Sequence, residues 1–222
     1  MIGGASKAGK SGSESLSETP AWVVTFADLM TLLFCFFVLL TTLSTQPKNC
    51  NGLEKYLNEN RKYFKNYELR SSKLECILSL PSDFLFRSGE GRIQKRALDD
   101  MVPFFNKVKK MEEHQKDLMI VEGHTDNVPI NTSTFPSNWE LSSARATNIA
   151  TFLVNRMNFS REMVSIAAYA DSRPKVEYKD IYGSKISGNE LRAARKINRR
   201  VEIIFVNQPE SREETSMLFD GR

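Results

Sequence analysis

Hydrophobic positions divide the chain into one long apolar run near its N-terminus and a longer region of short alternating elements. The run from Trp22 to Leu43 (WVVTFADLMTLLFCFFVLLTTL) contains a single charged side chain, that of Asp28. Because about 20 helical residues cross a hydrocarbon core of about 30 Å, the pattern predicts a membrane-spanning helix over 20–43. An acid inside a span costs roughly 2.5–3.5 kcal/mol, so Asp28 is expected to have a function, such as handling an ion or proton.

The polar residues of this predicted helix follow one face. Thr25, Asp28, Thr31, Cys35 and Thr42 recur at helical spacing, whereas bulky Leu and Phe side chains occupy the other faces. A stripe of small and polar residues is typical of a surface that another helix covers. We therefore expect a partner helix, or a second copy of this one, to cover Asp28.

Residues 44–73 carry a second apolar pattern. Apolar residues recur near helical spacing from Leu53 to Tyr67, with charged residues between them. The pattern predicts a short amphipathic helix just outside the bilayer. It would lie on the membrane, cover the mouth of a channel, or pack as a linker. Fully extended, residues 44–73 would span about 100 Å.

From Leu74 onward, short β-type and helical patterns alternate. The predicted elements, in chain order, are a strand over 74–80, a strand end and turn at 84–89, a helix over 97–111, a strand over 118–122, a helix over 138–157, a strand over 164–169, a helix over 190–197 and a strand over 200–206. The alternation predicts an α/β sandwich over 74–207 with helices on one sheet face, so the fold class is α+β behind a single membrane helix. The polar composition of residues 1–19 and 208–222 predicts disordered tails.

Composition excludes several classes of function. The formal net charge of +4 is small, and the basic residues do not alternate with aromatic ones, which argues against nucleic-acid binding. With two histidines and no CxxC motif, we expect no metal site. No activated nucleophile, P-loop or dinucleotide motif is present, so no enzyme is predicted. Cys50 and Cys76 could pair if this part is extracytoplasmic, but the sequence leaves two free thiols equally open.

The flanks of the apolar run indicate how it is used. Its hydrophobic stretch is too long for a cleaved signal peptide, and no A-x-A site follows it. Lys7 and Lys10 precede the run and Lys48 follows it, which on balance favours a cytoplasmic N-terminus. The chain is therefore expected to be a single-pass membrane protein.

Three motifs gather polar residues after predicted strands and around a helix start: GHTDN, NWELSSARA and RKINRRVE. Asn138 is the expected N-cap of the helix that contains the second motif. If Asp126, Arg145 and Arg199 converge, they form a site with charges of both signs. Arginine would bind a carboxylate and aspartate would accept from an ammonium group, so a zwitterionic ligand would fit.

The same motifs resemble a known family. GHTDNVPI, FPSNWELSSARA, AYADSRP and NRRVEI, in that order, closely resemble the OmpA-like peptidoglycan-binding domain, in the version found in flagellar motor stator B subunits of the MotB/PomB type. PAWVVTFADLMTLLFCFFVLL resembles the single membrane helix of that family. The resemblance covers roughly residues 20–43 and 76–206.

The resemblance implies an inner-membrane stator subunit with a periplasmic domain that grips the diaminopimelate stem of peptidoglycan. The implied wall-binding residues are Thr125, Asp126, Arg145, Asn198 and Arg199. Asp28 would be the ion-carrying carboxylate, with Thr25 and Thr31 in support, and residues 44–73 would form a plug and linker. The implied partners are a second copy of the chain, a multi-span A-type subunit (MotA/PomA-like), peptidoglycan and, indirectly, the rotor. No cofactor is implied beyond the transported ion, for which Na⁺ is favoured over H⁺.

Two alternatives remain at the level of sequence. An energiser subunit like ExbD or TolR also carries an aspartate in one span but lacks the wall-binding motifs. A static anchor of the OmpA/Pal kind has no need of Asp28. One departure from the family is Ala168, where glycine is frequent, so the turn before D-S-R-P is expected to differ slightly.

Overall fold

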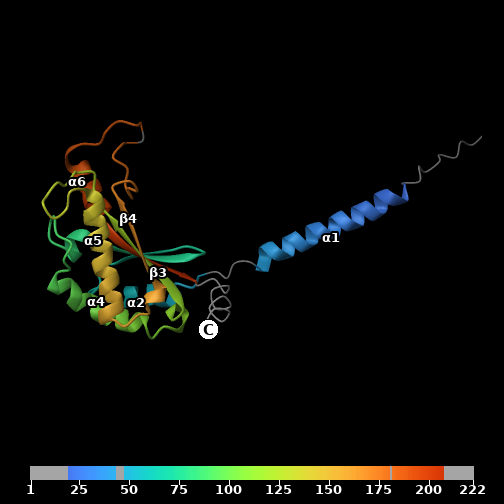
Figure 1. Ribbon diagram of the computed structural model, residues 1–222, viewed down its shortest axis with the longest axis horizontal. Coiled ribbons are helices and arrows are strands. Elements are labelled where there is room, and N and C mark those ends of the chain that lie inside the picture. Colours follow the sequence, from blue (N-terminus) through green and yellow to red (C-terminus); the bar gives the residue numbers. More distant parts are fainter. Residues whose placement is uncertain (1–19, 44–47, 181, 208–222) are drawn as a thin grey trace, which may run out of the picture. The chain divides into compact units, whose positions relative to one another are not determined.

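The computed structural model describes residues 20–43, 48–180 and 182–207 (Figure 1). The predicted tails at 1–19 and 208–222 lie outside the described residues. The chain divides into two compact units, Met1–Thr45 and Gln46–Arg222, each of which is described by itself.

The first unit contains one helix, α1 (Ala21–Leu43). Its stretch Ala21–Thr41 is the only one among the described residues that is long and apolar enough to cross a membrane. Pro20 precedes the helix, and its carbonyl accepts a hydrogen bond from the Val23 amide at 2.8 Å. A proline at this position costs little because the first amides of a helix have no partner within it.

The second unit is built on a five-stranded sheet in the order β1-β2-β5-β3-β4. Its strands are β1 (Glu68–Ser71), β2 (Glu75–Pro81), β3 (Asp117–His124), β4 (Val164–Ala170) and β5 (Arg200–Asn207). All neighbouring strands are antiparallel except β3 and β4, which are parallel and need a crossover helix between them. The structure matches the four predicted strands and adds β1, whose short and mostly polar sequence ELRS gave no alternation to recognise.

The helices of this unit are α2 (Asn51–Glu59), α3 (Ser82–Leu85), α4 (Lys95–Val108), α5 (Asn138–Thr151) and α6 (Gly188–Asn198). Three short elements complete it: η1 (Glu112–His114), η2 (Phe152–Arg156), which continues α5, and η3 (Arg161–Met163). The predicted strand end at residues 84–86 is wrong, because these residues form the single turn α3 and the bridge that follows it. A run of three apolar residues fits either structure, and their contact with the core decides between them.

One hydrophobic core holds these elements together, with α2, α4 and α5 contributing to it along with the sheet. Every second residue of β3 and β5 enters it, including Met119 and Val121 on β3 and Ile203 on β5. Phe104 and Phe105 of α4 are fully buried at its centre, with ring centroids 5.1 Å apart. The structure therefore confirms the predicted sandwich of helices on a sheet.

The segment predicted as a plug and linker is partly built into this domain. Helix α2 is amphipathic as expected, but its apolar residues Leu53 and Leu57 are buried in the domain core, together with Phe64. The boundary expected between residues 73 and 74 therefore lies further toward the N-terminus. An amphipathic pattern indicates that one helix face is covered, but it does not indicate which surface covers it.

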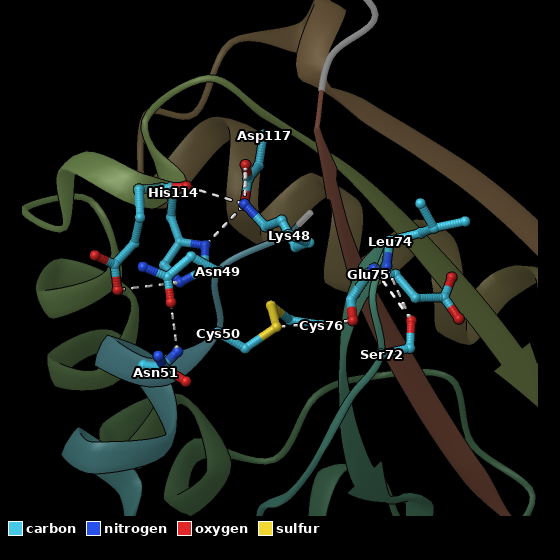
Figure 2. Close-up of a disulfide and its surroundings, with 11 residues drawn as sticks. Lys48, Asn49, Cys50, Asn51, Ser72, Leu74, Glu75, Cys76, His114 and Asp117 are labelled. Carbon is cyan, nitrogen blue, oxygen red and sulfur yellow. Dashed lines mark hydrogen bonds and ion pairs between the residues drawn. A yellow bond between two sulfur atoms is a disulfide. The ribbon is translucent and has the colours of Figure 1, made fainter. Parts of the chain in front are cut away.

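A disulfide fastens the start of α2 to the sheet (Figure 2). Cys50, at the N-cap of α2, is bonded to Cys76 of β2, and the two Cα atoms are 5.8 Å apart. Both residues are buried. This pairing resolves the question that the sequence left open, and Cys35 in α1 is the free cysteine.

A buried ion pair lies beside the disulfide (Figure 2). The Lys48 ammonium group donates to a carboxylate oxygen of Asp117 and, at 2.9 Å, to the Glu113 carbonyl. The other Asp117 oxygen lies 2.7 Å from Nδ1 of His114. Removing one partner of a buried ion pair strands the other charge, so this cluster and the disulfide both fix residues 48–50 to the domain.

Candidate ligand-binding site

The GHTDN loop begins where β3 ends. The Thr125 amide donates to the Ala170 carbonyl at 2.8 Å, which joins the loop to the end of β4. Oδ1 of Asp126 accepts from the Val128 amide at 3.1 Å and closes an Asx turn. The second oxygen, Oδ2, accepts from Nη1 of Arg199 at 2.7 Å. Asp126 is thus held by its own loop at one oxygen and by an arginine at the other.

Helix α5 presents Arg145 to the same region. Its N-cap is Ser137, whose side chain accepts from the Trp139 amide at 3.1 Å, so the expectation that Asn138 caps the helix is wrong. The Asn138 amide donates instead to the carbonyls of Asp126 and Val128, at 3.3 and 3.0 Å, and braces the loop. A serine immediately before an asparagine offers two adjacent cap candidates, and the backbone conformation selects between them.

Arg145 is buried and remains a cation. Its Nε donates to the Glu90 carbonyl at 3.0 Å, and its guanidinium carbon lies 5.1 Å from the centroid of the Phe86 ring. Burial lowers the pKa of Arg145 to about 10, still well above neutral pH. The described residues accept from Nε alone, so the terminal nitrogens keep N–H groups for a ligand carboxylate.

Arg199 lies between two carboxylates, directly before β5. Its Nε and Nη2 donate to the two oxygens of Asp83 at 3.1 and 2.8 Å, and its Nη1 donates to Asp126. The hydrogen bond to Asp83 is the largest factor that raises the pKa of Arg199 above its ordinary value, while burial opposes it. The same hydrogen bond lowers the pKa of Asp83.

These groups face one groove of about 750 Å³. Its walls come from the region of α3 and the start of α4, from the GHTDN loop and the residues after it, and from α5 and the residue before β5. The lining residues are Asp83, Phe86, Arg87, Ser88, Gly89, Gln94, Arg96, Thr125, Asp126, Val128, Pro129, Ile130, Asn138, Leu141, Arg145 and Arg199. The structure therefore brings together four of the five candidate wall-binding residues. Paired charges of both signs in one groove can bind a ligand that carries a carboxylate and an ammonium group.

Asn198, the fifth candidate, is not among the residues that line this groove. Its side chain is fully buried, and its Oδ1 accepts from the amides of Lys175 and Val176 at 2.8 and 2.9 Å. Its Nδ2 donates to the Val176 carbonyl at 2.8 Å. The side chain thus holds the loop after D-S-R-P, and its contact with a ligand stays a prediction.

Asp83 is one of the groove residues that sequence reasoning missed, along with the charged Arg87 and Arg96. It follows a predicted strand in an ordinary polar pair, Ser82-Asp83, which carries no motif. The Ser82 amide donates to the Arg199 carbonyl at 2.9 Å, so the backbone places Asp83 beside the arginine with which it pairs.

The unusual backbone conformation in the AYADSRP turn lies at Ala170. This residue has φ of +48°, whereas Ala168, the residue flagged by the sequence comparison, is not among those with positive φ. The Ala170 amide donates to the Ser142 hydroxyl at 3.2 Å, and its carbonyl accepts from Thr125. These two hydrogen bonds offset the strain of a left-handed alanine, which costs roughly 1–2 kcal/mol.

A second charged cluster lies on β3 and β5, within the strands that precede and follow the groove residues Asp126 and Arg199 in the sequence. Glu122, His124 and Glu202 form a group of potential metal ligands, all within 4.8 Å of one another. Arg200 and Arg70 each donate to one oxygen of Glu202, at 2.9 and 2.8 Å. Because two guanidinium groups already balance this carboxylate, an ion-pair network explains the cluster better than a metal centre does. The absence of a metal site stays a prediction.

In α1, the hydroxyls of Thr25 and Thr31 donate to the carbonyls of Trp22 and Ala27, at 2.9 and 2.7 Å. Their protons are satisfied within the helix, while the oxygen lone pairs remain free to accept or to contact a cation. The side chain of Thr42, the last residue of the predicted stripe, lies outside the described part of the chain.

Comparison with known proteins gives two family matches. Residues 6–60 match the model described as the membrane MotB of the proton-channel complex MotA/MotB, and residues 85–185 match the OmpA family. The uncharacterised protein YtxE of Bacillus subtilis is 27% identical, over 88% of this chain and 91% of its own length. Motility protein B of the same organism is 26% identical, over 69% of this chain and 53% of its own length.

Solved structures show the same fold. The cell-wall anchor of the type VI secretion system of Pseudomonas aeruginosa superposes with a TM-score of 0.58 at 22% identity, over 73% of this chain and all of that one. The periplasmic domain of Helicobacter pylori MotB superposes with a TM-score of 0.54 at 21% identity, over 69% of this chain and 90% of that one.

Proposed function

Because the chain is MotB-like, with an OmpA-like domain behind one apolar helix, we propose that it is the ion-carrying, wall-anchored subunit of a flagellar motor stator. The observation that carries the proposal is the presence of two features in one chain. One is an acid within a helix that can span a membrane, and the other is a groove of paired charges in a wall-binding fold. Torque needs both an ion site and a rigid attachment.

The groove is proposed to bind the diaminopimelate stem of peptidoglycan. Arg145 would bind a stem carboxylate through its terminal nitrogens, and Asp126 would accept from an ammonium group. Thr125 and Arg199 line the same groove and would shape it. Arg145, Arg199, Asp83 and Asp126 balance one another in charge, and a ligand with one carboxylate and one ammonium group adds no net charge to them.

Asp28 is proposed to carry the ion. One elementary charge moving through 100 mV releases about 2.3 kcal/mol, enough to drive a modest conformational step. The free lone pairs of Thr25 and Thr31 support our choice of Na⁺ over H⁺, although the family model that matches this segment is described as part of a proton channel.

We propose an inner-membrane location with a cytoplasmic N-terminus and a periplasmic domain. The Cys50–Cys76 disulfide supports a compartment in which disulfides persist. A second copy of the chain and a multi-span A-type subunit would cover Asp28, since a lone helix would expose this acid to lipid.

Wall binding is tested by sedimentation of full-length protein with purified peptidoglycan sacculi. We expect Asp126→Ala and Arg145→Ala each to weaken binding about 10- to 100-fold, since each removes a charge-assisted contact of about 1.5–3 kcal/mol. Arg161→Ala, an exposed arginine outside the groove, is the control. Undiminished binding by the double variant would refute the assignment.

The ion role is tested by motility in a strain that depends on this protein. Asp28→Asn should abolish swimming because it removes the carboxylate that would carry the ion. It should leave sacculus binding intact because it changes no residue of the OmpA-like domain. Thr41→Ala, which lies off the predicted stripe of α1, is the control and should swim normally. Full motility of the Asp28→Asn strain would contradict the ion role and favour a static anchor. The choice of ion has its own test: undiminished swimming of the wild-type strain at low Na⁺ would exclude Na⁺ as the coupling ion.

A further inference from the structure

Asp83 meets Arg199 in a fixed geometry. The hydrogen bond from the Ser82 amide to the Arg199 carbonyl, 2.9 Å long, fastens the first turn of α3 to the residue with which Asp83 pairs. A second contact, from Nη2 of Arg96 to the Asp83 carbonyl at 3.1 Å, holds the backbone from the other side. The Asp83 side chain lines the groove and is half exposed, so it could be solvated by water without a partner. Its ion pair with Arg199 is therefore not forced by burial.

The arginine divides its donors unequally between the two carboxylates. Asp83 receives the two-pronged contact from Nε and Nη2, whereas Asp126 receives one contact, from Nη1 at 2.7 Å. Asp126 also accepts one backbone amide, that of Val128. A carboxylate offers about four acceptor positions, so Asp126 keeps acceptor capacity on the side of the groove.

Loss of the Asp83 charge would change this division. Arg199 would then have Asp126 as its one remaining carboxylate partner among the described residues. Arginine and carboxylate groups often pair through two parallel hydrogen bonds, and such a contact would use the free acceptor positions of Asp126.

We propose that Asp83 is a positioning residue that diverts Arg199 from Asp126 and thereby keeps Asp126 open to the ammonium group of its ligand. The proposal rests on the proposed wall-binding function of this groove. It assigns Asp83 no contact with the ligand, so its effect must pass through Arg199.

A double-mutant cycle tests this coupling. Full-length protein in detergent is titrated with purified sacculi as the wild type, Asp83→Asn, Arg199→Gln and the double variant. We expect Asp83→Asn to weaken binding about tenfold or more. The double variant should bind as tightly as Arg199→Gln alone and more tightly than Asp83→Asn, because no arginine remains to block Asp126.

Two further variants separate this effect from others. Asp83→Glu keeps the carboxylate and should stay within a few-fold of the wild type, whereas a loss as large as that of Asp83→Asn would overturn the proposal. Asp99→Asn removes one exposed negative charge from α4 outside the groove and should leave binding unchanged. An equal loss in this variant would mean that net charge, and not Arg199, is responsible.

The outcomes distinguish this proposal from the one on which it rests. If the wild type fails to bind sacculi, the proposed function falls and this inference with it. If the wild type binds and Asp83→Asn is neutral, or weakens binding equally with and without Arg199, only the positioning role of Asp83 is overturned.

Discussion

At the scale of single residues, the hydrogen-bond donors that the groove offers depend on how Arg145 and Arg199 are held. Arg145 is fixed by one backbone carbonyl and an aromatic ring, which leaves its terminal nitrogens available. Arg199 is fixed by two carboxylates, which accept from all three of its nitrogens. The two residues have the same charge, but among the described residues only Arg145 has both terminal nitrogens free of a carboxylate partner.

The pairing of Asp83 with Arg199 predicts a pH dependence of stability. The hydrogen bond from Arg199 lowers the pKa of Asp83, so this carboxylate stabilises the native state above its unfolded pKa of about 3.9. The contribution is lost as the pH falls through the lower native pKa. We expect the difference in melting temperature between the wild type and Asp83→Asn to shrink as the pH falls from neutral toward 3. A difference that stays constant over this range would show that the ion pair contributes nothing.

At the scale of elements, the site depends on the close approach of α5 to β3. A Cβ atom at Gly123 would lie 2.2 Å from the backbone carbonyl oxygen of Ser142, a contact that no rotamer change can relieve. This approach also lets the Ser142 hydroxyl accept from the Ala170 amide, at the junction of β4 with the GHTDN loop. Arg145 follows Ser142 on the same helix, so its position depends on the same contact.

We therefore expect Gly123→Ala to be strongly destabilising. The helix and the strand would have to separate, at a cost of about 1–3 kcal/mol or more, and sacculus binding would fall with the displacement of Arg145. Urea unfolding and sedimentation measure the two effects. Ser143→Ala, on the exposed side of α5, is the control and should change neither, whereas a Gly123→Ala variant of normal stability would contradict the close packing.

At the scale of the whole molecule, the disulfide shortens the stretch of chain that can serve as a linker after α1. Cys50 is bonded to Cys76, so residues 51–75 form a closed loop that cannot add to the length of the chain between them. Only residues 44–49 separate Leu43 from Cys50, and fully extended they span about 25 Å at most. The length of about 100 Å expected from the sequence is therefore not accessible while the disulfide is intact.

Removal of the disulfide should lower stability markedly. For a separation of 26 residues, loop-closure entropy predicts a loss of about 3–4 kcal/mol in the free energy of unfolding for the Cys50→Ser/Cys76→Ser variant. Thermal unfolding with and without reductant measures this loss. The Cys35→Ser variant, which removes the free cysteine, is the control and should behave as the wild type does. Equal stability of the double variant would mean that α2 is held by packing and by Lys48 alone.

The sequence by itself determined the membrane helix, four of the five strands and the three longer helices of the domain after residue 74, and its motifs singled out Asp126, Arg145 and Arg199, whose convergence the tertiary structure decided. Periodicity and motifs are local signals, and each of these features is written within a short stretch of chain. Only the tertiary structure decided which surface covers α2, that Cys50 and Cys76 pair, that Asn198 supports a loop, and that Asp83 belongs to the site. Asp83 and Arg199 are 116 residues apart in sequence, and they meet because the antiparallel register of β2 and β5 pairs Pro81 with Arg200. Strand register follows from the packing of the whole sheet, so no local pattern around either residue could have revealed their contact.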